Sequence, residues 1–406
     1  MKYNKVLLGV TLIFTSVTLN VYSQWTKITS GTTKNLKAVS FADNLNGYAV
    51  GDGGQILKTT DGGGSWNVIT TSSTTVNLWD VTTVSGTIYI VGDKFLALKS
   101  TDGGASWQNV GPASTSSSDF LFGIQCLDAN TCFAAGGDGN LVPNSGVVFV
   151  TTNGGSSWQE TNVSSMYFVD KSYFVNSNIG YAVGYGSTGA ATISKTINGG
   201  TTWTTVYASS SPGYMDDIFC TDENHCFTVG LNSLKTQDGG ASWTSVGLGY
   251  WDVDFNGNHG ILTGKSGQIS ESLDNGNTWN NVSYATTDAI FGSEILNNGK
   301  VIAVGQGGLI LVKATSGINT YANPLQAKVY PTLTSGHITI ELNEDSPRNT
   351  TISVMNILGD IVWKNEGIIN RSNDFDLKSL GMQPGIYIIK MDAIDEHMVQ
   401  KVVLTE

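Results

Sequence analysis

The chain has 406 residues with a net charge of −12 at pH 7, so it is long enough for two or three domains with ordinary cores. Its acidity argues against binding to nucleic acids or anionic membranes, which needs clustered lysine and arginine. The 49 glycines and many Ser, Thr and Asn residues suit short strands joined by tight turns, and no long segment has helical periodicity. We therefore expect an acidic, soluble, all-β protein.

Residues 1–23 have the features of a secretory signal peptide. Lys2 and Lys5 give a positively charged start, and residues 6–14 form an apolar run before a predicted cleavage ahead of Gln24. This run is shorter than the roughly 20 residues that span a bilayer. No other stretch qualifies as a transmembrane segment, so the mature chain is expected to have none. The alternative is an uncleaved membrane anchor.

A turn motif ending in Trp is repeated along the next part of the chain. Each copy has Ser or Thr, any residue, Asp or Asn, a glycine-rich turn, a small polar pair and Trp. The six copies are residues 59–66, 100–107, 151–158, 196–203, 236–243 and 272–279. A second marker ending in Gly precedes each copy, and its first example is residues 48–51. A period near 40 residues with four short strand-like runs per unit indicates β-propeller blades.

The two ends of this repeat region complement one another. Residues 290–313 have the apolar strands of a seventh unit but lack the turn motif, whereas residues 25–28 form a lone strand before the first unit. If the lone strand completes the last unit, the ring closes and no sheet edge stays exposed. We therefore predict a seven-bladed β-propeller over residues 24–313.

The turn motif resembles the Asp-box of bacterial neuraminidase repeats. The propeller as a whole resembles the seven-bladed photosystem II assembly-factor type. This resemblance implies the architecture but no activity, because fold does not determine function.

The Asp-box residues are expected to be structural. The Asp or Asn should cap its own turn, and each Trp should pack between neighbouring sheets with its indole N–H bonded to a partner. A calcium loop would need alternating carboxylates and a closing Glu, which these turns lack. The positions are Asp61, Trp66, Asp102, Trp107, Asn153, Trp158, Asn198, Trp203, Asp238, Trp243, Asp274 and Trp279.

The four cysteines form two pairs with the same spacing. Cys126 and Cys132 flank a predicted turn, as do Cys220 and Cys226, so the members of each pair should face one another across a hairpin. Export to an oxidising compartment would allow two disulfides. The rival, a four-cysteine zinc site, would require two non-neighbouring repeats to converge.

The repeat ends at a polar linker, residues 314–326, and residues 327–406 have the alternating pattern of a small β-sandwich. Strands are predicted over residues 327–330, 337–342, 351–356, 361–364, 386–391 and 399–404.

This tail resembles the C-terminal sorting domain of the type IX secretion system of Bacteroidetes. The matching segments are VYP at 329–331, TSG at 334–336, ISVMN at 352–356, PGIYIIK at 384–390 and QKVVL at 400–404. The chain departs from the family at Thr332 and Leu333, where Asn-Pro is usual. The resemblance implies passage through the periplasm and across the outer membrane and recognition of residues 327–406 by the secretion machinery. It also implies removal of the domain, with release of the protein or its attachment to surface polysaccharide at the outer-membrane cell surface. The alternative is an ordinary accessory β-sandwich.

Several kinds of active site are excluded by the residues present. A sialidase clamps its substrate carboxylate with arginines, but the only arginines are Arg348 and Arg371 in the tail, so this activity is rejected. No pair among the four histidines has metal-ligand spacing, and no cofactor-binding fingerprint occurs in its required context. We expect no metal, no cofactor and no nucleic-acid partner.

The first strand of each blade supplies the remaining candidate site, because in propellers this strand lines the central channel. Aromatic platforms beside carboxylates suit neutral sugars or a basic, aromatic-rich peptide. Alternatively, the aromatic residues pack between blades and the acids form a solvated rim. The candidates are Trp79, Asp80, Phe122, Asp170, Asp216, Asp217, Trp251, Asp252 and Phe291.

Three functions remain open. The first is a monomeric, non-catalytic module that binds a protein or glycan at the cell surface. The second is a glycan hydrolase resembling Asp-box xyloglucanases, with two of Asp80, Asp217 and Asp252 as acid and base, about 6.5–9.5 Å apart if inverting. The third is a structural component of an adhesin or matrix. The sequence favours the first, since no acid has a dedicated partner and no long loop builds a groove wall.

Overall fold

The computed structural model describes residues 25–69, 74–114, 116–138, 140, 145–314, 327–342, 348–356, 361–369, 372–393 and 396–405. The predicted signal peptide at 1–23 lies outside the described residues, as does the predicted linker apart from Ala314. No helix in these described segments is long and apolar enough to cross a membrane.

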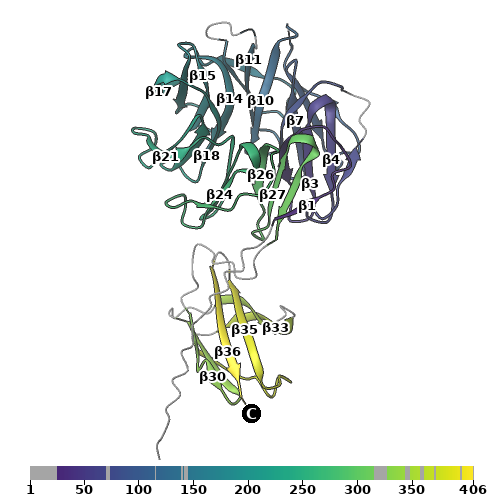
Figure 1. The fold of residues 1–406 in the computed structure, drawn as a ribbon, viewed down its shortest axis with the longest axis vertical. Coiled ribbons are helices and arrows are strands. Elements are labelled where there is room, and N and C mark those ends of the chain that lie inside the picture. Colours follow the sequence, from purple (N-terminus) through teal and green to yellow (C-terminus); the bar gives the residue numbers. More distant parts are fainter. Residues whose placement is uncertain are drawn as a thin grey trace, which may run out of the picture.

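Residues 25–313 form seven antiparallel blades of four strands each (Figure 1), and one bridge between Gly137 and Phe168 joins the sheets of blades 3 and 4. Blade 1 is β2 (Leu36–Phe41), β3 (Gly47–Gly51), β4 (Gln55–Thr59) and β5 (Asn67–Ile69); blade 2 is β6 (Leu78–Val84), β7 (Thr87–Gly92), β8 (Leu96–Ser100) and β9 (Gln108–Asn109). Blade 3 is β10 (Asp119–Cys126), β11 (Cys132–Asp138), β12 (Val147–Thr151) and β13 (Gln159–Asn162); blade 4 is β14 (Met166–Phe174), β15 (Gly180–Gly186), β16 (Ala190–Thr196) and β17 (Thr204–Pro212).

The remaining blades follow the same plan. Blade 5 is β18 (Met215–Cys220), β19 (Cys226–Gly230), β20 (Asn232–Thr236) and β21 (Thr244–Leu248); blade 6 is β22 (Asp252–Asn256), β23 (His259–Thr263), β24 (Ile269–Ser272) and β25 (Asn280–Asn281). Blade 7 is β26 (Ile290–Ile295), β27 (Val301–Gly305), β28 (Ile310–Lys313) and β1 (Trp25–Ile28). Short 3-10 turns are η1 (Asp52–Gly54), η2 (Lys265–Gly267) and η3 (Gln306–Gly308). The predicted all-β fold with seven blades is confirmed.

The N-terminal strand closes the ring as predicted. β1 pairs antiparallel with β28, from Trp25 opposite Lys313 to Ile28 opposite Ile310 (Figure 1). The Trp25 side chain is buried, and its Nε1 donates a hydrogen bond of 3.0 Å to the carbonyl oxygen of Val282 after blade 6. Closure therefore also fastens blade 7 to blade 6.

Each Asp-box is a turn held by its own side chains. In the first copy, the Gly63 N–H donates to Thr59 Oγ1 at 3.0 Å, and Thr59 Oγ1 in turn donates to Asp61 Oδ1 at 2.8 Å. The Ser65 N–H donates to the same Asp61 oxygen at 2.9 Å. Asn153 accepts the corresponding N–H bond at 2.9 Å in its box, so an amide oxygen replaces the carboxylate there.

Lysines join the boxes to the preceding blades. A lysine ammonium donates to the carbonyl oxygen of a box glycine in the next blade, over 2.6–3.0 Å. The pairs are Lys58 with Gly103, Lys99 with Gly154, Lys195 with Gly239, and Lys300 with Gly62. The repeated turn is therefore part of the seam between blades.

The indole groups of the boxes differ from expectation. Trp66 Nε1 donates to the Gly63 carbonyl at 3.2 Å, and Trp158 Nε1 donates to the Val110 carbonyl at 2.7 Å. The prediction of an N–H partner is wrong for the four other boxes, whose buried Nε1 atoms have no hydrogen-bond partner among the described residues: Trp107, Trp203, Trp243 and Trp279. The last three pack edge to face against Phe174, Tyr181 and Phe227, so ring packing rather than a carbonyl sets their position.

Both predicted disulfides are present. Cys126 bonds Cys132 across the β10–β11 hairpin, and Cys220 bonds Cys226 across β18–β19. The two Cα atoms of each pair are 4.0 Å apart. Each disulfide is a local clip within one blade.

The C-terminal region is a β-sandwich, as predicted. One sheet contains β29 (Ala327–Tyr330), β31 (His337–Leu342) and β34 (Ser372–Asp376); the other contains β30 (Leu333–Thr334), β36 (Glu396–Leu404), β35 (Gly385–Ala393), β32 (Arg348–Met355) and β33 (Ile361–Ile369). Ile340 and Ile389 pack in the core between the sheets. The sequence missed β30, which has two residues, and β34, whose sequence SNDFD lacks alternating apolar residues.

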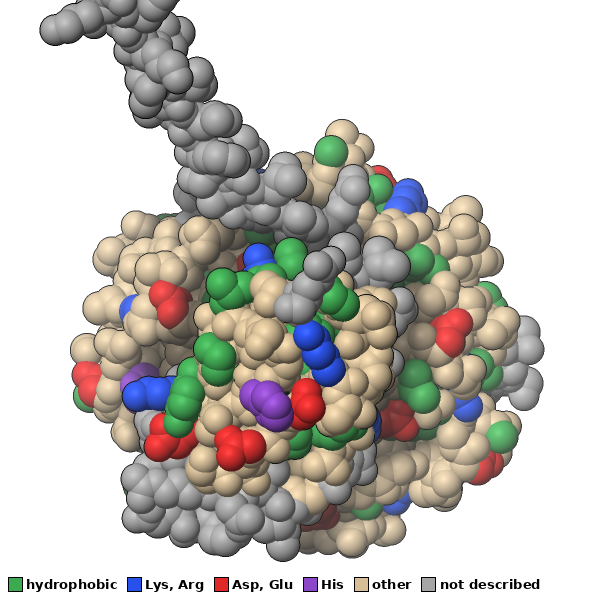
Figure 2. All heavy atoms as spheres, turned by 90° about the horizontal axis from the view of Figure 1, so that it is seen from below, with side chains coloured by type: hydrophobic (Ala, Val, Ile, Leu, Met, Phe, Trp, Pro, Cys, Tyr) green, Lys and Arg blue, Asp and Glu red, His purple; other side chains and the backbone are tan. Residues whose placement is uncertain are grey.

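The surface carries few charges. Figure 2 shows one face on which acidic and basic groups are scattered between uncharged side chains and backbone. The interior of the ring contains a cavity lined by the inner strands.

The box hydroxyl can be tested by substitution. Thr59 is fully buried and both donates to Asp61 and accepts from Gly63, so Thr59→Val leaves a buried N–H without a partner. We expect a loss of about 1–3 kcal/mol of unfolding free energy in urea titrations. Thr59→Ser keeps both bonds, as Ser100 does in blade 2, and should cost less. Equal stability of the Val variant and the wild type would contradict this role.

Candidate functional site

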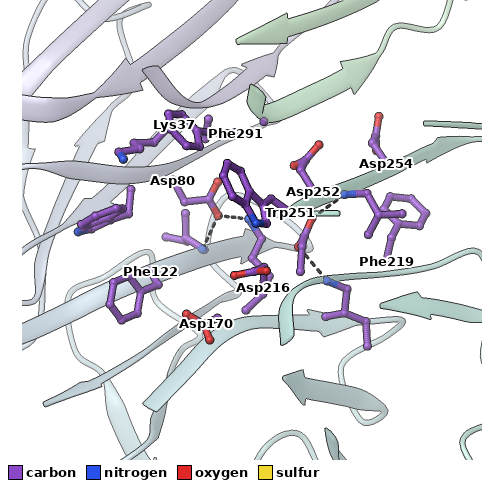
Figure 3. Close-up of a pocket in the computed structure, with 18 of the residues that line it drawn as sticks. Lys37, Asp80, Phe122, Asp170, Asp216, Phe219, Trp251, Asp252, Asp254 and Phe291 are labelled. Carbon is purple, nitrogen blue, oxygen red and sulfur yellow. Dashed lines mark hydrogen bonds and ion pairs between the residues drawn. The ribbon is translucent and has the colours of Figure 1, made fainter. Parts of the chain in front are cut away.

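The first strands of the seven blades surround a central cavity of about 660 Å³ (Figure 3). These strands are β2, β6, β10, β14, β18, β22 and β26. All nine residues that the sequence singled out as channel candidates line this cavity. The alignment of the repeats therefore located the cavity wall correctly, whereas a role in binding stays a prediction.

A β-bulge near the start of the inner strand aims one side chain per blade into the cavity. In β2 the pairing shifts between Leu36 and Ala38, and the same shift recurs in five other inner strands. A bulge leaves its extra residue unpaired and re-aims the side chain. We call the residues at this position, together with Trp251 just before β22, the entrance ring. Its members in blade order are Lys37, Trp79, Phe122, Asp170, Asp216, Trp251 and Phe291.

Five consecutive members of the entrance ring form an aromatic arc around one lysine. Lys37 Nζ lies 4.9 Å from the ring centroid of Trp79 and 4.4 Å from that of Phe291. Trp79 packs edge to face on Phe122 at 5.4 Å, and Trp251 stacks on Phe291 at 5.7 Å. Cation–π attraction and ring stacking thus fix the arc without a ligand.

The other two members are carboxyl groups that lie next to one another (Figure 3). Burial, followed by the charge of Asp216, raises the pKa of Asp170 well above its usual range. Burial, followed by the charge of Asp217, raises the pKa of Asp216 to about 7. Neither carboxyl group accepts a hydrogen bond from a described residue, and Asp216 Oδ2 is buried. The entrance ring is therefore polarised, with an aromatic arc facing an acid pair.

The three remaining candidate acids, Asp80, Asp217 and Asp252, each follow the entrance-ring residue of their blade in sequence and connect neighbouring blades. Asp80 Oδ2 accepts the Ile124 N–H of blade 3 at 2.8 Å and lies 2.7 Å from Lys171 Nζ of blade 4. Burial lowers the pKa of Lys171, but the negative charges of Asp80 and Asp217 outweigh burial and hold this pKa above its usual value.

The other two candidate acids reach the next blade in the same way. Asp217 Oδ2 accepts the Val253 N–H of blade 6 at 3.1 Å, while Asp252 accepts the Ser293 hydroxyl of blade 7. Burial raises the pKa of Asp217 to about 6, against the opposing effects of Lys171 and the backbone N–H bonds. These carboxyl groups hold the inner strands together.

Sequence reasoning missed four charged residues of the cavity: Lys37, Lys171, Asp254 and Glu294. Asp254 Oδ2 accepts the Ile295 N–H of blade 7 at 2.7 Å. Lys37 occupies the same repeat position as Trp79, so the alignment itself held the signal. Asp254 and Glu294 lie deeper in the strands, where alternation returns side chains to the cavity. In the described part of the chain, no group of three or more His, Cys, Asp and Glu residues could hold a metal ion.

Comparison with known proteins supports both resemblances seen in the sequence. Residues 17–189 match the family of photosynthesis system II assembly factor YCF48, and residues 328–405 match the secretion system C-terminal sorting domain. The propeller match spans less than half of the chain, and the match to the sorting domain indicates secretion or a cell-surface location and contact with the secretion machinery.

A curated relative is photosystem II assembly lipoprotein Ycf48 of Synechococcus sp. (strain CC9902). It is 36% identical over 73 residues, which are 16% of this chain and 22% of the relative. The chain thus spans about a fifth of the length of the curated relative that it matches.

Solved structures show the same fold. A structure titled "YCF48 bound to D1 peptide" has a TM-score of 0.59 and 20% identity, covering 73% of this chain and 98% of its own. YCF48 from Cyanidioschyzon merolae has a TM-score of 0.57 and 20% identity, covering 72% and 99%. The WD40 propeller domain of Doa1 has a TM-score of 0.56 and 10% identity, covering 73% and 98%.

The raised pKa of Asp216 predicts a pH-dependent stability. Its folded-state pKa of about 7 lies above the ordinary 3.8, so the folded protein binds this proton more tightly than the unfolded chain. The contribution of Asp216 to the unfolding free energy is therefore fully present at low pH and is lost as the pH rises from about 4 to 7. Asp216→Asn should therefore raise the unfolding free energy at pH 8 by roughly 1–3 kcal/mol and leave it unchanged near pH 4.

Urea unfolding at the two pH values measures this difference. Glu160→Gln, on the exposed outer strand β13, is the matched control and should change stability equally at both. A carboxyl pKa near 4 for Asp216 by NMR titration would contradict the account.

Proposed function

We propose that this chain, a YCF48-type propeller joined to a type IX sorting domain, is an exported, non-catalytic module that binds a segment of polypeptide at its entrance ring. The observation that carries the proposal is the polarised ring itself, with aromatic surfaces opposite unbonded carboxyl groups. Its cavity contains seven carboxyl groups and two lysines, an imbalance that favours a partner with positive charge. A propeller of the same fold occurs in a structure titled as a peptide complex, which is in keeping with this mode of binding.

The hydrolase alternative receives less support from the geometry. A glycosidase needs one carboxyl group to protonate the leaving oxygen and another to act on water or the sugar. Asp80, Asp217 and Asp252 instead accept hydrogen bonds from neighbouring blades, so these oxygens are engaged in holding the ring together. Moving any of them onto a substrate would break a contact between blades.

Export completes the proposal. We expect a signal peptide at residues 1–23 to direct the chain to the periplasm of a Bacteroidetes cell. The sorting domain then carries it across the outer membrane and is removed. The mature propeller is released or held at the cell surface, and it binds its partner as a monomer.

Ligand class can be tested on the purified secreted protein. A random peptide display library and a glycan array, combined with a reducing-sugar assay, separate peptide binding, glycan binding and turnover. We expect selected peptides and no released sugar. Glycan binding with sugar release would contradict the proposal and favour the hydrolase, and failure to select any peptide would overturn peptide binding.

The entrance ring can be tested by truncating one aromatic residue. Trp251→Ala removes a stacked ring surface, so affinity for a selected peptide should fall at least about tenfold with little change in melting temperature. Leu45→Ala is the control, because that side chain is 56% exposed in the β2–β3 turn outside the cavity. Unfolding of the Trp251 variant, or retained affinity, would instead indicate that this ring only packs between blades.

The sorting role predicts a change of location. A chain ending before residue 327 should keep its propeller but accumulate in the periplasm of a host with type IX machinery. Cell fractionation with immunoblotting measures this, and the full chain is the control. Equal amounts of both chains outside the cell would contradict a sorting function.

A further inference from the structure

We propose that Asp170 and Asp216 form a subsite for an ammonium or guanidinium group, and that the bound peptide places a lysine or arginine side chain there. The neighbouring aromatic arc would receive the apolar part of the same segment. This inference rests on the proposed function and specifies the chemistry that the partner must bring.

Among the described residues, the fold gives each of the other five carboxyl groups of the cavity a hydrogen-bond donor but gives none to Asp170 and Asp216. Asp80, Asp217, Asp252 and Asp254 each accept a hydrogen bond from the next blade. Glu294 likewise accepts the backbone N–H of Phe41, although its Oε2 is a buried oxygen without a partner among the described residues. Asp170 and Asp216 accept none from the described residues, although Asp216 Oδ2 is a buried oxygen. A buried polar atom that the fold does not satisfy needs another explanation, and a ligand provides one.

Neither lysine of the cavity neutralises the acid pair. Lys37 lies over Trp79 and Phe291, with its Nζ 3.7 Å from Asp52 Oδ1. Lys171 follows Asp170 in sequence, but its ammonium is directed to Asp80 at 2.7 Å. Both cations are therefore engaged elsewhere. Two adjacent carboxyl groups in a desolvated site repel one another when charged, and an incoming cation would remove that cost.

Aromatic rings flank the acid pair on both sides. Trp251 follows Asp216 around the entrance ring, and Phe122 precedes Asp170 and packs 5.7 Å from Phe168. A basic side chain carries its charge on an apolar stem, so it can meet the carboxylates with its head and the rings with its stem. A neutral sugar could stack on the rings but would leave both carboxyl groups without a counter-charge.

A pair of small probes tests the charge requirement without knowledge of the partner. Phenethylammonium has an aromatic ring and a cation, and 2-phenylethanol is its neutral counterpart. In NMR titrations of the secreted protein at pH 8, we expect phenethylammonium to bind with a Kd on the order of 1 mM, as suits a ligand of this size. The alcohol should bind about tenfold more weakly, or not measurably.

Substitutions assign the effect to the acid pair. Asp170→Asn and Asp216→Asn keep the shape of the side chain but remove its charge, so each should reduce the preference for the cation to less than about threefold. Glu160→Gln removes one negative charge from the outer strand β13 and should keep the full preference.

Proton binding gives a second readout. The inner strands packed against β18 are β14 and β22, and the charged cavity groups on these three strands besides Asp216 are Asp217 on β18, Asp170 and Lys171 on β14, and Asp252 and Asp254 on β22. A cation favours the charged form of the pair, so affinity for phenethylammonium should rise between pH 5 and pH 8. Affinity for the alcohol should stay level.

Equal affinities for the two probes, no binding of either, or an unchanged preference in both Asn variants would overturn the cation subsite. Peptide selection tests the proposed function separately. Peptides that bind without a basic residue would leave the binding module standing and refute only this subsite.

Discussion

The ring depends on the pairing of residues from opposite ends of the propeller. β1 supplies the outer strand of blade 7, and Trp25 buries its side chain among residues of blades 6 and 7. Without this strand, blade 7 would expose the edge of β28, and an open edge would invite pairing with other chains. Every inner strand contacts the next one around the axis, so the pairing of β1 with β28 fixes the positions of all seven inner strands relative to one another.

Closure converts a repeated sequence into a site that is not symmetric. Each blade directs one residue into the cavity, in six blades through a β-bulge, and the repeats differ at that position. Five blades contribute an aromatic residue or a lysine held by aromatic rings, whereas blades 4 and 5 contribute Asp170 and Asp216. The scaffold spaces the seven entrance-ring residues around the axis. Sequence differences between the repeats place aromatic residues on one side of this ring and acids on the other. Specificity thus resides in a few side chains on a common fold.

Much of this could be predicted from sequence because the relevant signals are local and periodic. The Trp and Gly spacing determined the number of blades, and aligning the inner strands identified nine residues of the cavity wall. The alignment of the repeats places Asp80 and Asp216 at different positions, but sequence could not show which carboxyl group has a hydrogen-bond donor beside it. The difference lies in whether a neighbouring blade offers an N–H or an ammonium, which depends on contacts 44 and 91 residues away for Asp80. The predicted indole partners failed for a similar reason at Trp243 and Trp279, because each of these rings packs against an aromatic ring of the preceding blade.

A crystal structure of the secreted protein with a display-selected peptide would test the central claim most directly. The account predicts that the peptide occupies the entrance ring, with a basic side chain within hydrogen-bonding distance of Asp170 or Asp216 and its apolar part against the aromatic arc. A peptide bound along the outer strands or the Asp-box turns, with the entrance ring unchanged, would contradict it.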